Sequence, residues 1–355
     1  MQTKVRSMTR SLLSIAAMAS FLSVVPFSFA DAPDKALDPA EVQARQAWRE
    51  AMHVLRAPAS GCFHASFPNT QWEEVECDSP APYRSVPPTT TVPLTTGNGF
   101  DYVAQAPHGH FINSALGYFP AWRDLKSETD GGYANEYSLQ LNTNVDPYSP
   151  ACNGYSGCFA WQQYVLVSNY FALGASGPSG KSEVFIQDWL INYGYHDGSN
   201  ICPAGWVDFG KVGTGDQCAR NSKAAVVYNG QIPISKLGDL ELGGTANAGG
   251  SDEVEAFYGK DGYKVSNPDS RSDIALDWSQ AEFNVVGNGG GSKAVFNSGA
   301  GLEVEILLDY GSSSTPKCQP PAKHLGTTGE TNNLTLGECA AGVGEYPYIE
   351  FIEEN

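Results

Sequence analysis

The chain is predicted to be an all-β protein, an antiparallel β-sandwich with one short helix near its N-terminus. From about residue 99 onward, short runs rich in Val, Ile, Tyr, Phe and Trp are separated by clusters of Gly, Asn, Asp and Pro. This spacing is typical of strands joined by frequent turns. No helical apolar pattern lies between the runs, which excludes a fold of alternating strands and crossover helices.

The first thirty residues have the pattern of a secretory signal peptide. Three basic residues precede the apolar run SLLSIAAMASFLSVV, and Ser28 and Ala30 place small side chains before a cleavage site. Pro26 ends the apolar run too early for a membrane anchor, which needs about 20 apolar residues. We therefore expect cleavage near Ala30 and a secreted or periplasmic location.

A single substantial helix is expected at residues 39–55, PAEVQARQAWREAMHVL. Val42, Trp48 and Met52 fall on one helical face. Pro39 stands at the start of the run, where a helix tolerates proline.

The chain is divided by composition after the helix. Residues 78–98 are rich in Pro and Thr and have no apolar period, as in a linker or an extended surface arm. Residues 31–98 therefore form an N-terminal region with a helix, a disulfide loop and this arm, and could be a removable pro-segment. Residues 99–355 form the predicted β-sandwich domain.

The expected strands follow in order along that domain, within the runs at 110–120, 135–144, 159–173, 183–194, 223–234, 238–244, 281–287, 293–299 and 301–311.

Charge and cysteine content restrict the partners and the compartment. The formal charge is −18, and loss of residues 1–30 with their three basic side chains would leave −21. Such a surface repels nucleic acid and anionic membranes. Eight cysteines in an exported chain are best interpreted as disulfides. They form four close pairs in the sequence, and we expect the bridges Cys62–Cys77, Cys152–Cys158, Cys202–Cys218 and Cys318–Cys339.

Sequence motifs of the common catalytic and cofactor-binding classes are absent. His108 and His110 would share a strand face but have no third ligand nearby, so no metal or cofactor is expected. Glu303 and Glu305 also share a face, which the alternation of a half-exposed strand explains.

Aromatic residues offer a possible binding surface. Trp161, Tyr164 and Trp189 lie in the central strands, where aromatic side chains on a concave sheet could stack on sugars or line a cleft for a peptide. Alternatively, they fill the core of a large β domain.

The order of the blocks GHFINSALGYFP, FAWQQYVLV, VFIQDWLINYG, IPISKLGDLEL and DWSQAEFNVVG resembles that of the glutamic peptidases, the eqolisins, over about residues 105–310. The resemblance implies a concanavalin/eqolisin-like sandwich of two large antiparallel sheets. It also implies a secreted, acid-active endopeptidase in which a Gln and a Glu of the concave sheet act together. The Glu would activate a water, and the Gln would hold that water and stabilise the oxyanion.

Gln187, in VFIQDW, matches the Gln of the family. The acid is harder to match. When the family's block is aligned with AEFNVV, its first acid falls on Glu282, and its catalytic Glu falls on Val286. Glu282, Asn284 and Val286 share a strand face, but Glu282 and Val286 are about 13 Å apart. On this alignment Glu282 stands on the correct face at the wrong level along the strand.

Two functions follow from these patterns. The first is a non-catalytic or divergent relative that binds an extended peptide or glycan along the concave sheet with Trp161, Tyr164, Trp189 and Asn284. The second is an active glutamic-type endopeptidase that uses Gln187 with a relocated acid, Glu282 being the first candidate. The sequence leaves open whether the protein is an enzyme, and it is expected to be a monomer.

Overall fold

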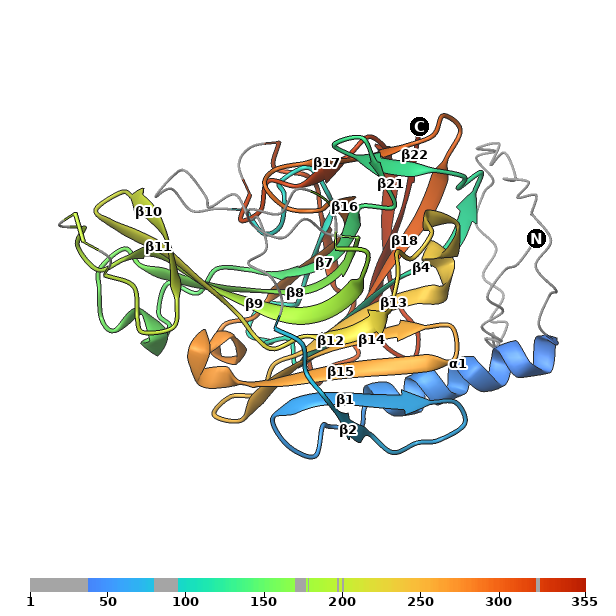
Figure 1. Cartoon of the computed structure of the whole chain (residues 1–355), viewed down its shortest axis with the longest axis horizontal. Helices are drawn as coiled ribbons and strands as arrows, with labels where there is room; N and C mark the ends of the chain where they lie inside the picture. Colours follow the sequence, from blue (N-terminus) through green and yellow to red (C-terminus); the bar gives the residue numbers. More distant parts are fainter. Residues whose placement is uncertain are drawn as a thin grey trace, which may run out of the picture.

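The computed structural model describes residues 38–79, 95–169, 177, 179–196, 198–199, 201–323 and 326–355. The predicted signal peptide and most of the predicted arm lie outside the described residues. In the described part, the chain forms two large, mainly antiparallel sheets, a small third sheet and one α-helix (Figure 1). The predicted all-β sandwich with an N-terminal helix is confirmed.

Sheet I has the spatial order β2 (Glu73–Val75), β1 (Gly61–Ser66), β15 (Asp261–Pro268), β14 (Ser251–Tyr258), β13 (Leu240–Thr245), β4 (Ser114–Arg123), β18 (Gly301–Asp309), β22 (Pro347–Glu354) and β21 (Thr335–Val343). Sheet II has the order β10 (Val207–Val212), β11 (Gly215–Asn221), β9 (Ser182–Tyr193), β8 (Phe159–Ser168), β7 (Tyr137–Thr143), β16 (Gln280–Gly287), β3 (Val103–Gln105) and β19 (Lys317–Gln319), and β12 (Ala225–Tyr228) also pairs with β9. The small sheet has the order β20 (Thr331–Asn332), β17 (Lys293–Phe296), β5 (Glu128–Asp130) and β6 (Tyr133–Ala134). Short 3₁₀ helices span Pro150–Cys152 (η1), Ile234–Asp239 (η2), Asp269–Arg271 (η3) and Ile274–Leu276 (η4).

The main core lies between the two large sheets. Leu141 and Phe283 of sheet II are fully buried in one cluster with Leu242 and Val254 of sheet I. Side chains alternate along a strand, so the residues next to Leu141 and Phe283 point to the other face of sheet II, away from β13 and β14 of sheet I. We call that side the outer face of sheet II. In Figure 1, β7, β8 and β9 lie above β13 and β14 and are strongly curved.

The N-terminal helix α1 (Pro39–His53) packs on sheet I. Asp38 caps it by accepting a hydrogen bond from the backbone of Ala40, and Pro39 occupies the first turn. Trp48 and Met52 pack in one cluster with residues of β1 and β14, next to which α1 lies in Figure 1. The helix ends two residues before the end of the predicted range, 39–55.

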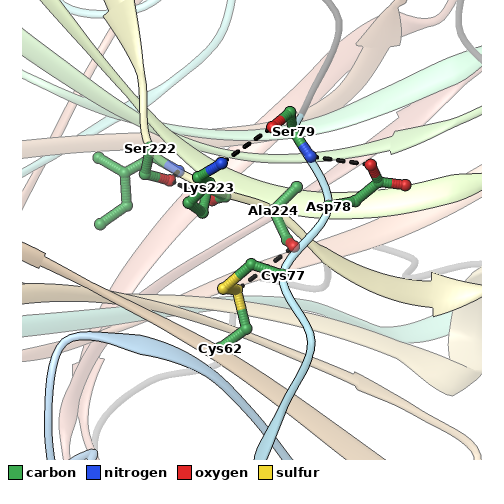
Figure 2. Close-up of a disulfide and its surroundings, with 8 residues drawn as sticks. Cys62, Cys77, Asp78, Ser79, Ser222, Lys223 and Ala224 are labelled. Carbon is green, nitrogen blue, oxygen red and sulfur yellow. Dashed lines mark hydrogen bonds between the residues drawn. A yellow bond between two sulfur atoms is a disulfide. The ribbon is translucent and has the colours of Figure 1, made fainter.

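The predicted disulfide pairing is confirmed: Cys62–Cys77, Cys152–Cys158, Cys202–Cys218 and Cys318–Cys339 are bonded. Figure 2 shows the first bridge, at the point where the chain leaves sheet I and Asp78 pairs with Ala224 next to sheet II. Four disulfides suggest an extracellular or otherwise oxidising location. In the part of the chain that the structure describes, no helix is long and apolar enough to cross a membrane.

The sequence analysis missed the hairpin of β14 and β15. Its strands carry Asp252, Glu253, Glu255 and Lys264, all of which are at most 3% exposed in the structure. Charged residues at such positions break the apolar alternation by which a half-buried strand is recognised. The β1 strand of the N-terminal region pairs with β15 of this hairpin, so the region shares a sheet with the rest of the molecule.

Candidate functional site

A row of polar side chains crosses the outer face of sheet II. In the strand register, Gln187 of β9 lies opposite Gln163 of β8, which lies opposite Asn142 of β7, which lies opposite Glu282 of β16. On the other side, Asn221 of β11 lies opposite Gln187. We call these five residues the polar row. Neighbouring strands are about 4.8 Å apart, so the backbones of Gln187 and Glu282 are separated by roughly 14 Å across the sheet.

The register gives the level of Glu282 relative to Gln187. Val286, where the sequence alignment places the family's acid, lies opposite Ser138 of β7 and in line with Val167 of β8 and Glu183 of β9. Glu282, and not Val286, is therefore the residue of β16 at the level of Gln187. That Glu282 stands at the wrong level for the family's acid stays a prediction, because the register shows only which residue of β16 lies level with Gln187.

Hydrogen bonds divide the polar row into two halves. Asn142 donates to a carboxylate oxygen of Glu282 over 2.5 Å, and Gln163 donates to Asn142 over 3.0 Å. Gln187 donates to Asn221 over 2.7 Å and accepts from the indole of Trp189 over 2.8 Å. Gln163 Oε1 is buried without a hydrogen-bond partner among the described residues. The structure thus aligns Gln187 and Glu282 but holds each of them in its own hydrogen-bonded group.

Glu282 belongs to a cluster of buried carboxyl groups. Its side chain is 2% exposed and is hydrogen-bonded to the carboxyl of Asp101, which is 6% exposed. Asn284, predicted as a binding residue, is buried and donates to Glu353, a third acid whose pKa burial and the nearby Asp101 raise to about 8. Burial raises the pKa of Glu282 well above its usual range, and Asp101 adds to this effect. Burial also raises the pKa of Asp101.

This environment determines the protonation of the pair. Two carboxyl groups that share a hydrogen bond in a dry site cannot both ionise, so Asp101 and Glu282 hold a proton between them over a wide pH range. A pair of this kind offers one basic and one acidic oxygen at the same time, which is the requirement for general acid–base chemistry.

A loop from Thr95 to Asp101 covers Glu282. A methyl group placed on Gly97 would come within 2.3 Å of the Glu282 carboxyl carbon. Thr96 donates to Gln280 over 2.6 Å, and the backbone of Gly97 donates to Thr327 over 3.1 Å. In this state the carboxyl cluster is closed to a substrate. Gly97 falls within residues 31–98, the predicted N-terminal region.

The predicted aromatic platform is corrected by the structure. Trp161 and Trp189 do lie on the outer face, but each is at most 1% exposed, because they pack in one cluster with Val212 and Phe209 of β10. Tyr164 points to the opposite face and is fully buried in the main core. These three rings support the sheet and offer no exposed stacking surface.

Three members of the polar row, Asn142, Gln163 and Asn221, were not predicted. Asn142 and Gln163 are polar residues at buried positions of apolar strands, 1% exposed each. The sequence does contain a signal for them, since SLQLNT and AWQQYVLV place amides where strand alternation would allow apolar residues. Asp101 offers no such signal, because it comes from a loop that only the tertiary fold brings to β16.

The described residues contain no group of three or more His, Cys, Asp or Glu side chains placed to hold a metal ion. The imidazole of His110 packs near the ring of Tyr310, 5.9 Å between centroids.

Comparisons with known proteins add little to this geometry. No protein-family model matches the chain, and no curated protein matches it. Among solved structures, the chain is similar to scytalido-glutamic peptidase, whose crystal structure contains a peptide-based transition-state analogue. The similarity covers 73% of this chain and 94% of that chain, with 10% sequence identity and a TM-score of 0.27. It is a distant structural resemblance, and a score this low carries no argument about the site.

Proposed function

We propose that the protein is an acid-active endopeptidase of the glutamic type in which Glu282 is the essential carboxyl group. The observation that carries the proposal is the strand register, which places Glu282 on the same face and at the same level as Gln187. This alignment supports Glu282 as the relocated acid, although the sequence alignment with the family places Val286 at the position of its catalytic Glu.

The chemistry of the neighbouring groups supports the proposal. A carboxylate of the Asp101–Glu282 pair can take a proton from an attacking water, and its protonated partner can return one to the leaving amine. The amide N–H groups of Asn142 and Gln163 lie next to Glu282 in the polar row and can donate hydrogen bonds to an oxyanion. A row of amides across the sheet also suits a polypeptide, since each amide can pair with a backbone C=O or N–H group.

The closed state of the site is consistent with a precursor. Glu282 is reached by a substrate only after the loop at Gly97 has moved, and residues 31–98 include that glycine. If these residues are removed as a pro-segment after export, the cover of Glu282 is removed with them. The proposed activity therefore belongs to the processed protein.

The test compares matched Glu→Gln variants. The exported protein is incubated with denatured casein between pH 3 and pH 7, peptides are detected by mass spectrometry, and the N-terminus of the protein is sequenced before and after. Glu282→Gln is expected to lower cleavage by about 100-fold or more, the usual contribution of general acid–base groups. Glu303→Gln, on the partly exposed face of β18, is the control and is expected to leave cleavage unchanged.

Two results would contradict the proposal. Full cleavage by Glu282→Gln would exclude Glu282 as the essential acid. Absence of cleavage at every pH, after the N-terminal region has been removed, would exclude the peptidase and favour the second candidate, a protein that only binds an extended polymer.

A further inference from the structure

A pocket lies at the edge of sheet II, beside Gln187. Strand β10 begins at Val207, opposite Ala219, so the end of β11 has no paired strand outside it. The pocket at this open edge has a volume of about 330 Å³. It is lined by Ser79, Gln187, Gly205, Val207, Phe209, Ala219, Arg220, Asn221, Ser222, Lys223 and Arg271. In Figure 2, Lys223 reaches Ser79 of the chain segment that follows Cys77.

The charged residues that line the pocket are all cations: Arg220, Lys223 and Arg271. This composition is opposite to that of the whole chain, which has 39 acidic and 21 basic residues. Three cations gathered at one hollow of an acidic protein produce a local positive potential, which concentrates anions.

The two arginines of the pocket differ from the other arginines that the structure describes. Arg45, Arg49, Arg56 and Arg123 each form an ion pair with a glutamate, at distances from 2.5 to 3.0 Å. Among the same described residues, Arg220 and Arg271 form no ion pair within 4.0 Å and no side-chain hydrogen bond, and Nη1 of Arg271 is buried without a partner. Their donors are therefore available to a ligand.

One carboxyl group, Asp188 of β9, compensates these charges in part. It is 1% exposed, and burial raises its pKa to about 7, although the attraction of Arg271 and Arg220 opposes the rise. Below pH 7 it takes up a proton, and the two arginines then face the pocket without a counter-charge.

We propose that this pocket binds a carboxylate group, carried by an acidic side chain or the C-terminus of a polypeptide. Two guanidinium groups that form no ion pair within 4.0 Å among the described residues present planar pairs of donors that fit a carboxylate, and Gln187 and Asn221 also line the pocket. The volume suits one or two side chains. Since Gln187 belongs both to the pocket and to the polar row, the pocket would select acidic substrates. That selection rests on the proposed function, whereas carboxylate binding does not.

The test measures binding of a peptide to a variant that is expected not to cleave it. Glu282→Gln full-length protein is titrated by calorimetry at pH 5.5 with N-acetyl-tetraglutamate amide and with the neutral N-acetyl-tetraglutamine amide. At this pH the glutamate side chains are ionised and Asp188 is protonated, so removal of an arginine leaves no buried charge unpaired. We expect the glutamate peptide to bind at least tenfold more tightly than the glutamine peptide.

Matched variants assign the binding to the pocket. Arg220→Gln and Arg271→Gln, in the same background, are each expected to weaken binding of the glutamate peptide about tenfold or more. Arg220→Lys keeps the charge and loses the planar donor pair, so an intermediate loss is expected. Arg123→Gln, on sheet I, makes the same charge change elsewhere and is expected to have no effect. Thermal unfolding of each variant confirms that it is folded.

The outcomes separate this inference from the proposed function. Equal binding of the two peptides would contradict carboxylate binding in the pocket. Equal binding of the glutamate peptide by Arg220→Gln and Arg123→Gln would also contradict it. Binding of inorganic phosphate without any binding of the glutamate peptide would show a general anion site and would also contradict carboxylate binding in the pocket. Selective peptide binding, together with no cleavage by the processed protein that keeps Glu282, would support the pocket and contradict the peptidase. Cleavage without preference for acidic residues would contradict selection of substrates by the pocket.

Discussion

Gly97 lies directly against the side chain of Glu282, and its backbone has a φ of +71°. Both conditions exclude other residues, because a side chain at positive φ is strained and a Cβ would overlap the carboxyl. This glycine fixes how closely the covering loop approaches the acid. At the scale of single residues, Gly97 allows the loop to cover the carboxyl group of Glu282.

We predict that Gly97→Ala destabilises the folded protein much more than Gly109→Ala. Gly109 has a similar φ of +83°, but no atom lies within 4 Å of a Cβ placed there. Both variants carry the backbone strain, about 1 kcal/mol, and only Gly97→Ala adds the clash with Glu282. Chemical denaturation measures the difference in the free energy of unfolding. Equal losses for the two variants would show that the loop adjusts freely.

Helix α1 is held on sheet I by charges as well as by its apolar side chains. Arg49 pairs with Glu241 of β13 over 2.8 Å, and His53 pairs with Glu255 of β14. Burial disfavours the charged form of both His53 and Glu255. The attraction of Glu255 outweighs burial for His53 and raises its pKa, and the attraction of Lys264, followed by that of His53, outweighs burial for Glu255 and lowers its pKa. At the scale of this element, docking depends on pH.

The direction of the pH dependence follows from these two shifts. The contribution of Glu255 is present above its unfolded pKa, near 4.5, and is lost as the pH falls through its lowered pKa. The contribution of His53 is present below its unfolded pKa, near 6.5, and is lost as the pH rises through its raised pKa. Docking of α1 is therefore strongest between these limits and weakens in acid.

We predict that Glu255→Gln loosens α1 near pH 6. Removal of one partner of a buried ion pair leaves the other uncompensated, so hydrogen exchange of the α1 amides should increase about tenfold or more. Glu41→Gln breaks the partly exposed pair with Arg45 and is the control, with little change expected. Unchanged exchange in Glu255→Gln would show that the Arg49–Glu241 pair and the packing of Trp48 and Met52 hold the helix without the His53–Glu255 pair.

The whole molecule contains many buried acids with raised pKa values. Burial raises the pKa of Glu128 to about 9, with Asp130 and Glu136 adding to the rise. Burial also raises the pKa values of Glu353 and Asp188, to about 8 and about 7. Between pH 5 and pH 8 the unfolded chain has released these protons while the folded protein keeps them, so the unfolded state binds fewer protons and stability falls as the pH rises.

We predict that thermal stability is highest near pH 4 to 5 and lower at pH 8, by more than about 5 °C in Tm. Glu353→Gln, which mimics the protonated acid, should reduce this difference relative to the unmodified protein. Calorimetry at several pH values measures it. A Tm that rises from pH 5 to pH 8 would show that the buried acids are ionised in the folded state.

The amino-acid sequence determined the local features of this protein. The β class, the N-terminal helix and the pairing of near-neighbour cysteines follow from short-range patterns. Alternation along β16 correctly gave Glu282, Asn284 and Val286 one common face, because strand periodicity is a property of the backbone itself. The same reasoning could not recognise β14 and β15, whose buried Glu and Lys residues find their partners on α1 and on each other.

Only the tertiary structure decided which residues meet. The level of Glu282 relative to Gln187 depends on the pairing of four strands, and a shift of two residues in any one pair would align Gln280 or Asn284 with Gln187 in place of the acid. The approach of Asp101 and Gly97 to Glu282, and of Arg220 to Arg271, joins segments far apart in the sequence. Sequence periodicity specifies the face of a side chain, whereas its neighbours across the sheet are set by packing and hydrogen bonding of the whole fold.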